Sequence, residues 1–270
     1  TIVLNGGPDN APVYIPDTGI PPSWSGKSIY ELSRMELEAI GRNCAVLVQK
    51  IRELQSGTAS ARQVNLGTMG IPLVGVVRDV WPQGLVAYSY DTPASWDELK
   101  MMVRYLALVS IKEGFSGSAH LVGWSNEKRG EGPVLRELRL ADLKESSRVL
   151  TARTLLKKMV SWYRLGQTRP LPFFPRTSRA FADVLSKAVD PETAVDAAIN
   201  KARQAWRSWR EDAWHGEGLD ANIRRVWGEE LPIDDVTGAG GPLPDGYDFK
   251  TLAKEIWTPF QRVLIDEEEQ

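Results

Sequence analysis

The amino-acid sequence predicts an α/β domain followed by a helical extension. An apolar period of about 3.6 residues over residues 28–54 indicates a long amphipathic helix. Short segments rich in β-branched and aromatic residues follow and are separated by glycine-containing turns, which is typical of strands. After residue 138 the pattern is mostly helical. The predicted order is therefore helix, three strands, helix and strand, followed by further helices.

The first helix takes Ser28 as its N-cap and ends before Gly57. We expect strands at residues 63–66, 71–80, 85–90 and 118–124, with a compact hairpin connection between Trp81 and Leu85. A second helix is expected over residues 95–112, and residues 126–133 are expected to form an exposed turn. The later helices are expected at roughly residues 141–165, 177–187, 192–214 and 248–264.

The first 26 residues are rich in Pro, Gly and Asn, and we interpret them as an irregular arm or the end of a preceding domain. Residues 27–270 would then form one domain. No apolar run approaches the ~18 residues that span a bilayer, and the N-terminal residues lack the pattern of a signal peptide. Cys44 is the only cysteine, which excludes an internal disulfide and favours a reducing, cytoplasmic location.

The net charge of −2 conceals a strong separation of charge along the chain. Residues 128–179 carry 13 Lys and Arg against 4 Asp and Glu, whereas residues 229–270 have a net charge of −8. No acidic residue lies between Glu145 and Asp183. A local basic excess of this kind can attract a polyanion while the whole chain stays close to neutral.

Basic side chains with hydroxyl neighbours suit contacts to DNA phosphates, which position a duplex without reading its sequence. The alternative interpretation, a solvated helix face, is equally compatible with the pattern. The candidate DNA-binding residues are Arg148, Arg153, Lys157, Lys158, Arg164, Arg169, Arg176 and Arg179.

Histidine and cysteine provide little basis for metal or nucleophile chemistry. His120 and His215 lie far apart in the sequence, and a single cysteine cannot build a zinc site. We expect neither a bound metal nor a cofactor. Trp206, Trp209 and Trp214 share a helix with several arginines and could stack on bases, although packing against the core is the commoner role of such a pattern.

Several stretches in this order and spacing resemble the C-terminal nuclease-like domain of the gamma chain (RecC) of exodeoxyribonuclease V, over about residues 18–264. These stretches are "GIPPSWSGKSIYEL", "GVVRDVWPQGLVAYSY", "DELKMMVRYLAL", "WYRLGQTRPLPFFPRTSRAF" and "IRRVWGEELP". The fourth of them is the most specific.

The resemblance implies a PD-(D/E)xK restriction-endonuclease-like core from which the catalytic residues have been lost. In nuclease domains of the related beta chain, two carboxylates hold the divalent metal and a lysine assists at the phosphate. The first Asp corresponds to Arg78, the second to Tyr88 and the Lys to Tyr90. The helix Gln and Tyr fall near Met102 and Arg104. A guanidinium repels a cation, and phenols are poor ligands for Mg²⁺.

As implied by the resemblance, the domain is not an enzyme itself but belongs to a complex with RecB-like beta and RecD-like alpha chains that acts on a double-stranded DNA end. A displaced, divergent exonuclease site using Asp79, Asp91 and perhaps Lys100 is one alternative. Because one residue along a strand reverses the facing direction, Asp79 and Asp91 are expected to point away from the site unless a bulge intervenes. A purely protein-binding scaffold is the other alternative.

Overall fold

The computed structural model describes residues 29–67, 72–90, 92–111, 115, 117–125, 132–140, 145–207, 216–232, 247–261 and 264–266. The chain divides into two compact units, Thr1–Arg42 and Asn43–Gln270. In the first unit the described part is helical and belongs to α1 (Ile29–Leu54). The account below concerns the second unit. The expected arm and the N-cap Ser28 lie outside the described residues, so the division at residue 26 stays a prediction.

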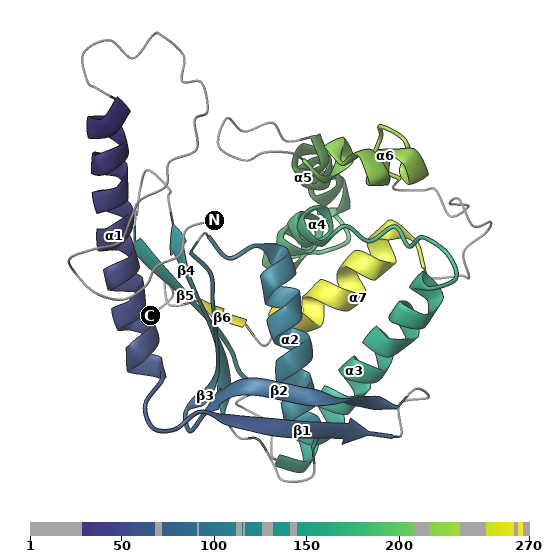
Figure 1. Ribbon diagram of the computed structural model, residues 1–270. Coiled ribbons are helices and arrows are strands. Elements are labelled where there is room, and N and C mark those ends of the chain that lie inside the picture. Colours follow the sequence, from purple (N-terminus) through teal and green to yellow (C-terminus); the bar gives the residue numbers. More distant parts are fainter. Residues whose placement is uncertain are drawn as a thin grey trace. The chain divides into compact units, whose positions relative to one another are not determined.

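A mixed sheet forms the centre of the second unit (Figure 1). Its described strands lie in the order β1-β2-β3-β4-β5-β6, and only β3 and β4 are parallel neighbours. The parallel pair requires a crossover, which α2 (Ser95–Ser110) provides. The strands are β1 (Ser60–Leu66), β2 (Leu73–Trp81), β3 (Gly84–Tyr88), β4 (Ser118–Ser125), β5 (Gly132–Leu138) and β6 (Leu264–Asp266).

Successive residues of β3 face opposite sides of the sheet and so show which helix covers which side. Val86 packs in one apolar cluster with Leu47 and Ile51 of α1. Its neighbour Leu85 packs in another cluster with residues of α2 such as Leu106. The C-terminal part of α1 therefore covers one face, and α2 covers the other together with α3 (Glu145–Gly166).

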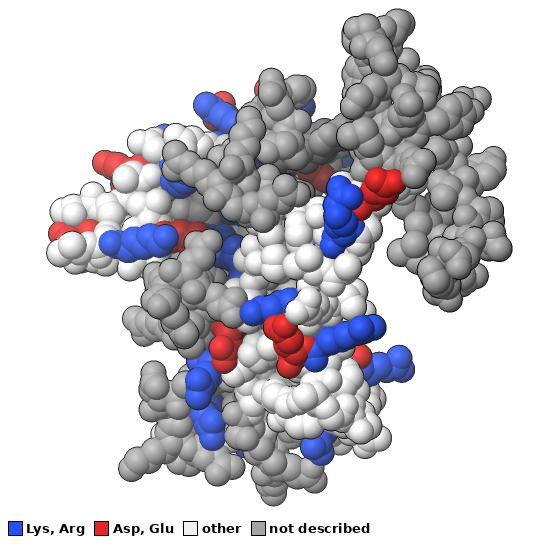
Figure 2. Space-filling view, turned by 90° about the vertical axis from the view of Figure 1, so that its left-hand side faces the viewer, with Lys and Arg blue, Asp and Glu red and all other residues white. Residues whose placement is uncertain are grey.

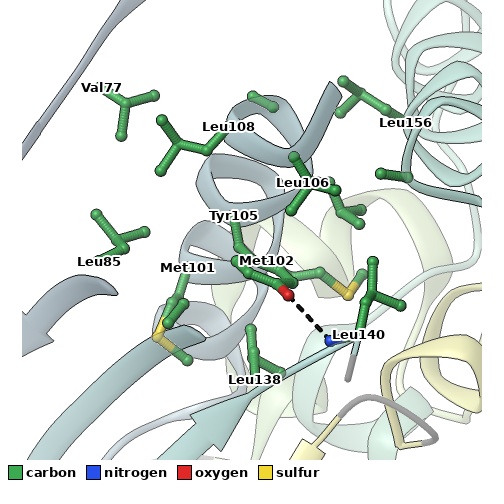
Figure 3. Close-up of a cluster of buried hydrophobic side chains, with 14 of the residues drawn as sticks. Val77, Leu85, Met101, Met102, Tyr105, Leu106, Leu108, Leu138, Leu140 and Leu156 are labelled. Carbon is green, nitrogen blue, oxygen red and sulfur yellow. Dashed lines mark hydrogen bonds between the residues drawn. The ribbon is translucent and has the colours of Figure 1, made fainter. Parts of the chain in front are cut away.

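The larger cluster forms the main core of the unit (Figure 3). Along α2 the side chains from Tyr105 to Val109 are all buried, because this helix lies between the sheet and α3. The Tyr105 hydroxyl oxygen accepts a hydrogen bond from the Leu140 backbone N–H at 2.9 Å. Burial raises the pKa of the Tyr105 phenol above its ordinary value, since the charged form would lose its hydration.

The helical extension has its own aromatic core. Phe174 makes edge contacts with the rings of Trp206 and Trp227, and Phe181 does so with Phe249. Trp206 is buried, and its indole N–H donates to the Glu229 carbonyl at 2.9 Å. The elements are α4 (Pro175–Lys187), α5 (Val195–Arg207), the 3₁₀ turn η1 (Glu217–Leu219), α6 (Ala221–Trp227) and α7 (Phe249–Gln261).

The α/β class and the order from α1 to β4 agree with the sequence prediction, including the short connection between β2 and β3. Two expectations were wrong. Gly132 and Pro133 begin β5 rather than ending a turn, and the last helix ends at Gln261, after which Leu264–Asp266 pairs with β5. Among the described residues, no helix is long and apolar enough to cross a membrane.

Candidate functional site

A β-bulge interrupts β2 where the first metal-binding carboxylate of a nuclease is expected. Ser60 of β1 pairs with Val80, whereas Arg62 pairs with Val77, so two residues of β2 lie opposite one residue of β1. These two are Arg78 and Asp79, and both are exposed, while Val77 and Val80 on either side are buried. Asp79 adopts a left-handed backbone conformation with φ 59°.

The bulge is the exception that the expected orientation of Asp79 allowed for. In a regular strand, Asp79 would point to the side of the sheet opposite Arg78. At the bulge this alternation is interrupted, and the side chains of both residues are exposed. The alternation of a regular strand therefore does not by itself argue against Asp79 as a ligand. Asp91, the second carboxylate of that alternative, lies outside the described residues.

Arg104 of α2 holds the bulge in place. Its Nη2 donates to the carbonyl of Arg78 at 2.8 Å and lies 3.8 Å from Oδ2 of Asp79. Arg104 thus connects α2 to Arg78, the position where the resemblance implies a metal ligand in related nucleases. A guanidinium this close to the Asp79 carboxylate opposes the approach of a divalent cation.

The remaining positions implied by the resemblance differ in burial. Tyr88 and Tyr90 are exposed, whereas Met102 is a core residue in the same buried cluster as Tyr105 (Figure 3). Lys100 pairs with Asp97 at 3.6 Å and lies over the ring of Trp96. No group of three or more His, Cys, Asp or Glu side chains able to hold a metal occurs within the described part of the chain.

The candidate DNA-binding residues of α3 form two sets with different surroundings. Arg153 is half-buried and donates from Nε and Nη2 to the carbonyl of Ser110, the last residue of α2, at 3.1 and 2.8 Å. Lys158 pairs with Glu255 at 3.4 Å. Lys157 and Arg164 are exposed and make no ion pair with any described residue.

Exposed residues of α3 recur at helical spacing and form one solvent-facing row. We call this row the α3 stripe, and it consists of Thr154, Lys157, Ser161 and Arg164. It contains cations and hydroxyl groups and no carboxylate. On the face of the molecule that Figure 2 shows, by contrast, basic and acidic side chains lie next to each other.

The other candidates lie on or near α4 or at the start of α3. Arg148, Arg169 and Arg176 are half-buried. The backbone N–H groups of Arg176 and Thr177 donate to the carboxylate of Glu217 at 3.1 and 2.7 Å, which caps the start of α4. This cap was not predicted, because the carboxylate comes from a distant segment.

Arg179 belongs to an interior ion-pair network that sequence reasoning also missed. Its guanidinium contacts the fully buried Glu98 of α2, which also pairs with Arg136 of β5. Arg179 lies over the ring of Trp257 and 3.5 Å from Asp183. Its contacts therefore connect three elements of the fold.

A comparison with protein-family models identifies a match over residues 30–186, which is more than half of the chain, to the family described as the RecC C-terminal domain. The chain belongs to the RecC C-terminal domain family. The resemblance noted in the sequence is thereby confirmed. Family membership associates the chain with the gamma chain of the exodeoxyribonuclease V (RecBCD) complex. A search of curated proteins gave no match.

The RecC match runs from α1 almost to the end of α4. It therefore includes the bulge, Arg104, the α3 stripe and the Glu98 network. It excludes α5, α6 and α7, although α7 supplies Trp257 to the contacts of Arg179.

Proposed function

We propose that this chain is a non-catalytic, nuclease-like domain of the RecC gamma chain that contacts duplex DNA during recombinational repair of double-strand breaks. The single observation that carries the DNA contact is the α3 stripe, where Lys157 and Arg164 project into solvent without a carboxylate partner among the described residues. Exposed cations at helical spacing neutralise phosphates and release counterions. The partners in this proposal are the RecB-like beta chain and the RecD-like alpha chain.

The proposed PD-(D/E)xK-like core rests on topology. The order α1, β1, β2, β3, α2, β4, the parallel neighbours β3 and β4, and helices on both faces of the sheet are all compatible with such a core. The proposed loss of catalysis rests on side-chain chemistry. Arg78, Tyr88 and Tyr90 offer no carboxylate, and Met102 is buried in the core.

DNA binding is tested by fluorescence anisotropy with a labelled duplex at several salt concentrations. Replacing both Lys157 and Arg164 by Ala should weaken binding and lower the slope of log K against log salt by about 1.8, or about 0.9 for each lost phosphate contact. The matched control replaces Lys187 and Arg225, two exposed cations outside the stripe, by Ala. Equal losses in the two variants would contradict the assignment to the α3 stripe.

The bulge is a specific observation in favour of a second candidate, a divergent metal-dependent exonuclease that uses Asp79. The test is incubation of the chain with linear DNA and Mn²⁺. We expect no degradation. Degradation that disappears in the near-isosteric variant Asp79→Asn would establish the exonuclease instead.

A further inference from the structure

Lys158 lies beside the α3 stripe but is not part of it. It follows Lys157 directly and therefore projects about 100° further around the helix. Its Nζ lies 3.4 Å from Oε1 of Glu255 in α7, and the two side chains are 50% and 38% exposed. The opposite charges thus meet at the surface, next to the cations of the stripe.

The packing of α3 against α7 places Glu255 in this position. Trp162, one turn after Lys158, lies in one apolar cluster with Leu252 and Ile256 of α7. Glu255 directly precedes Ile256, so the same packing brings its carboxylate beside α3. The α3 stripe lies within the region that matches the RecC family, whereas Glu255 lies in the part of the chain that follows it.

The hydroxyl groups of the α3 stripe leave phosphate binding to its cations. The hydroxyl of Thr154 donates to the carbonyl of Leu150 at 2.9 Å, and that of Ser161 donates to the carbonyl of Lys158 at 2.7 Å. Both hydroxyl protons are therefore used within the helix. A phosphate oxygen needs a donor, and the donors that remain are ammonium and guanidinium groups. The number of cations without a nearby anion then decides the affinity for DNA and its salt dependence.

We propose that Glu255 masks Lys158 and thereby sets the number of cations that α3 presents to DNA. This inference rests on the proposed DNA contact of the α3 stripe. With the carboxylate in place, the pair has no net charge, and a phosphate that approached Lys158 would also meet an anion. Without that charge, Lys158 becomes a third cation beside Lys157 and Arg164.

The exposure of the pair suits it to this role. Exposed ion pairs contribute little to stability, and the apolar cluster around Trp162 holds α3 and α7 together without it. Its effect on a polyanion is larger, because each cation available to a phosphate changes log K by about 0.9 per decade of salt. Loss of the Glu255 charge should therefore alter DNA binding far more than it alters the fold.

Salt titrations with the labelled duplex, read by fluorescence anisotropy, test the masking. Glu255→Gln keeps the size of the side chain and removes its charge. It should tighten binding roughly tenfold at about 50 mM salt. The slope of log K against log salt should become steeper by about 0.9, the value for one added phosphate contact. Circular dichroism verifies that the variant is folded.

A double-mutant cycle assigns the gain to Lys158. In the Glu255→Gln background, Lys158→Ala should abolish both the gain in affinity and the added slope. In the wild-type background, Lys158→Ala should not lower the slope, because Glu255 already neutralises this cation. The matched control is Glu230→Gln, which breaks an exposed pair with Arg207 outside α3 and should leave the slope unchanged.

Unchanged affinity and slope in Glu255→Gln would overturn the proposal, and so would an equal gain in Glu230→Gln. A gain that persists after Lys158→Ala would show that Glu255 acts only as a general negative charge, which contradicts masking.

Failure of the proposed DNA contact gives a different pattern of results. Replacing Lys157 and Arg164 by Ala would then leave binding unchanged, while the cycle of Glu255 and Lys158 is read independently. If the wild type does not bind the duplex even at low salt, binding by Glu255→Gln alone would support the masking. The absence of binding in both would overturn the masking and the DNA contact together.

Discussion

Glu98 of α2 and Arg179 of α4 form an ion pair in which the carboxylate is fully buried. Arg136 of β5 contacts the same carboxylate from the sheet. The three residues come from elements that are far apart in the sequence, so the pairing forms only when the α/β core and α4 are packed together. Removing water from a carboxylate is costly, and the two guanidinium groups offset that cost.

Removal of the buried charge should destabilise the whole unit. We expect Glu98→Gln to lower the free energy of unfolding by about 3–5 kcal/mol, because Arg136 and Arg179 would lose the buried anion that they share. Urea unfolding followed by circular dichroism measures the change. Glu230→Gln, which breaks an exposed pair with Arg207, should cost less than about 1 kcal/mol. Comparable losses in both variants would show that Glu98 contributes no more than a surface charge.

Tyr105 should make the fold sensitive to alkaline pH. Burial raises the pKa of the folded phenol, whereas the unfolded phenol ionises near pH 10. Above that pH the unfolded chain releases a proton that the folded chain retains, so stability falls as the pH rises. The urea midpoint should therefore decrease between about pH 9 and pH 11, and it should decrease less in Tyr105→Phe.

The same variant has a second expected effect at neutral pH. Tyr105→Phe leaves the buried N–H of Leu140 without its acceptor, which should cost about 1–3 kcal/mol. Tyr163→Phe, at an exposed position of α3, is the control. It should change neither the pH dependence of the urea midpoint nor the stability at neutral pH. If the urea midpoint decreased equally with rising pH in the wild type and in Tyr105→Phe, Tyr105 would be excluded as the titrating group.

The elements that the sequence predicted well are those set by local patterns. The apolar period of α1 and α2 and the tight connection after Trp81 need no knowledge of distant residues. The strand β5 was missed because Arg136 and Glu137 interrupt its apolar pattern, and both are accommodated by contacts with other elements. The bulge at Asp79 was foreseen only as a possibility, since the pairing partner of β2 decides its register.

The basic stretch shows the same limit at the level of single residues. In the sequence Arg153, Lys157 and Arg179 are equivalent cations in a segment without acids. In the structure Arg153 binds the end of α2 and Arg179 contacts Glu98, whereas Lys157 is exposed. Composition predicted a basic region, but only the packing of α3 and α4 separates structural cations from those available to a polyanion.

Gly84 should tolerate no side chain. A Cβ atom at this position would lie 2.2 Å from the carbonyl oxygen of Ser118, the residue that pairs with Gly84 across β3 and β4. Because the obstacle is backbone, Gly84→Ala should cost about 3 kcal/mol or more. Gly75→Ala, in β2 of the same sheet, meets nothing within 4 Å and should change stability by less than about 1 kcal/mol. Thermal unfolding of both variants measures the difference, and similar melting temperatures would contradict the close approach.

Arg153 and Lys157, four residues apart on α3, should differ in how strongly their substitution lowers stability. Arg153→Ala removes two charged hydrogen bonds to the carbonyl of Ser110 and should lower the free energy of unfolding by about 1.5–3 kcal/mol. Lys157→Ala should change it by less than about 0.5 kcal/mol, because the side chain is exposed and unpaired among the described residues. Urea unfolding measures these values.

DNA affinity should follow the reverse order in the same two variants. Lys157→Ala should weaken duplex binding and reduce its salt dependence, since it removes a cation of the α3 stripe. Arg153→Ala should leave the affinity of the folded chain close to that of the wild type when anisotropy is measured at a temperature where both are folded. If Arg153→Ala weakened DNA binding as much as Lys157→Ala without loss of stability, its guanidinium would contact DNA rather than hold the end of α2.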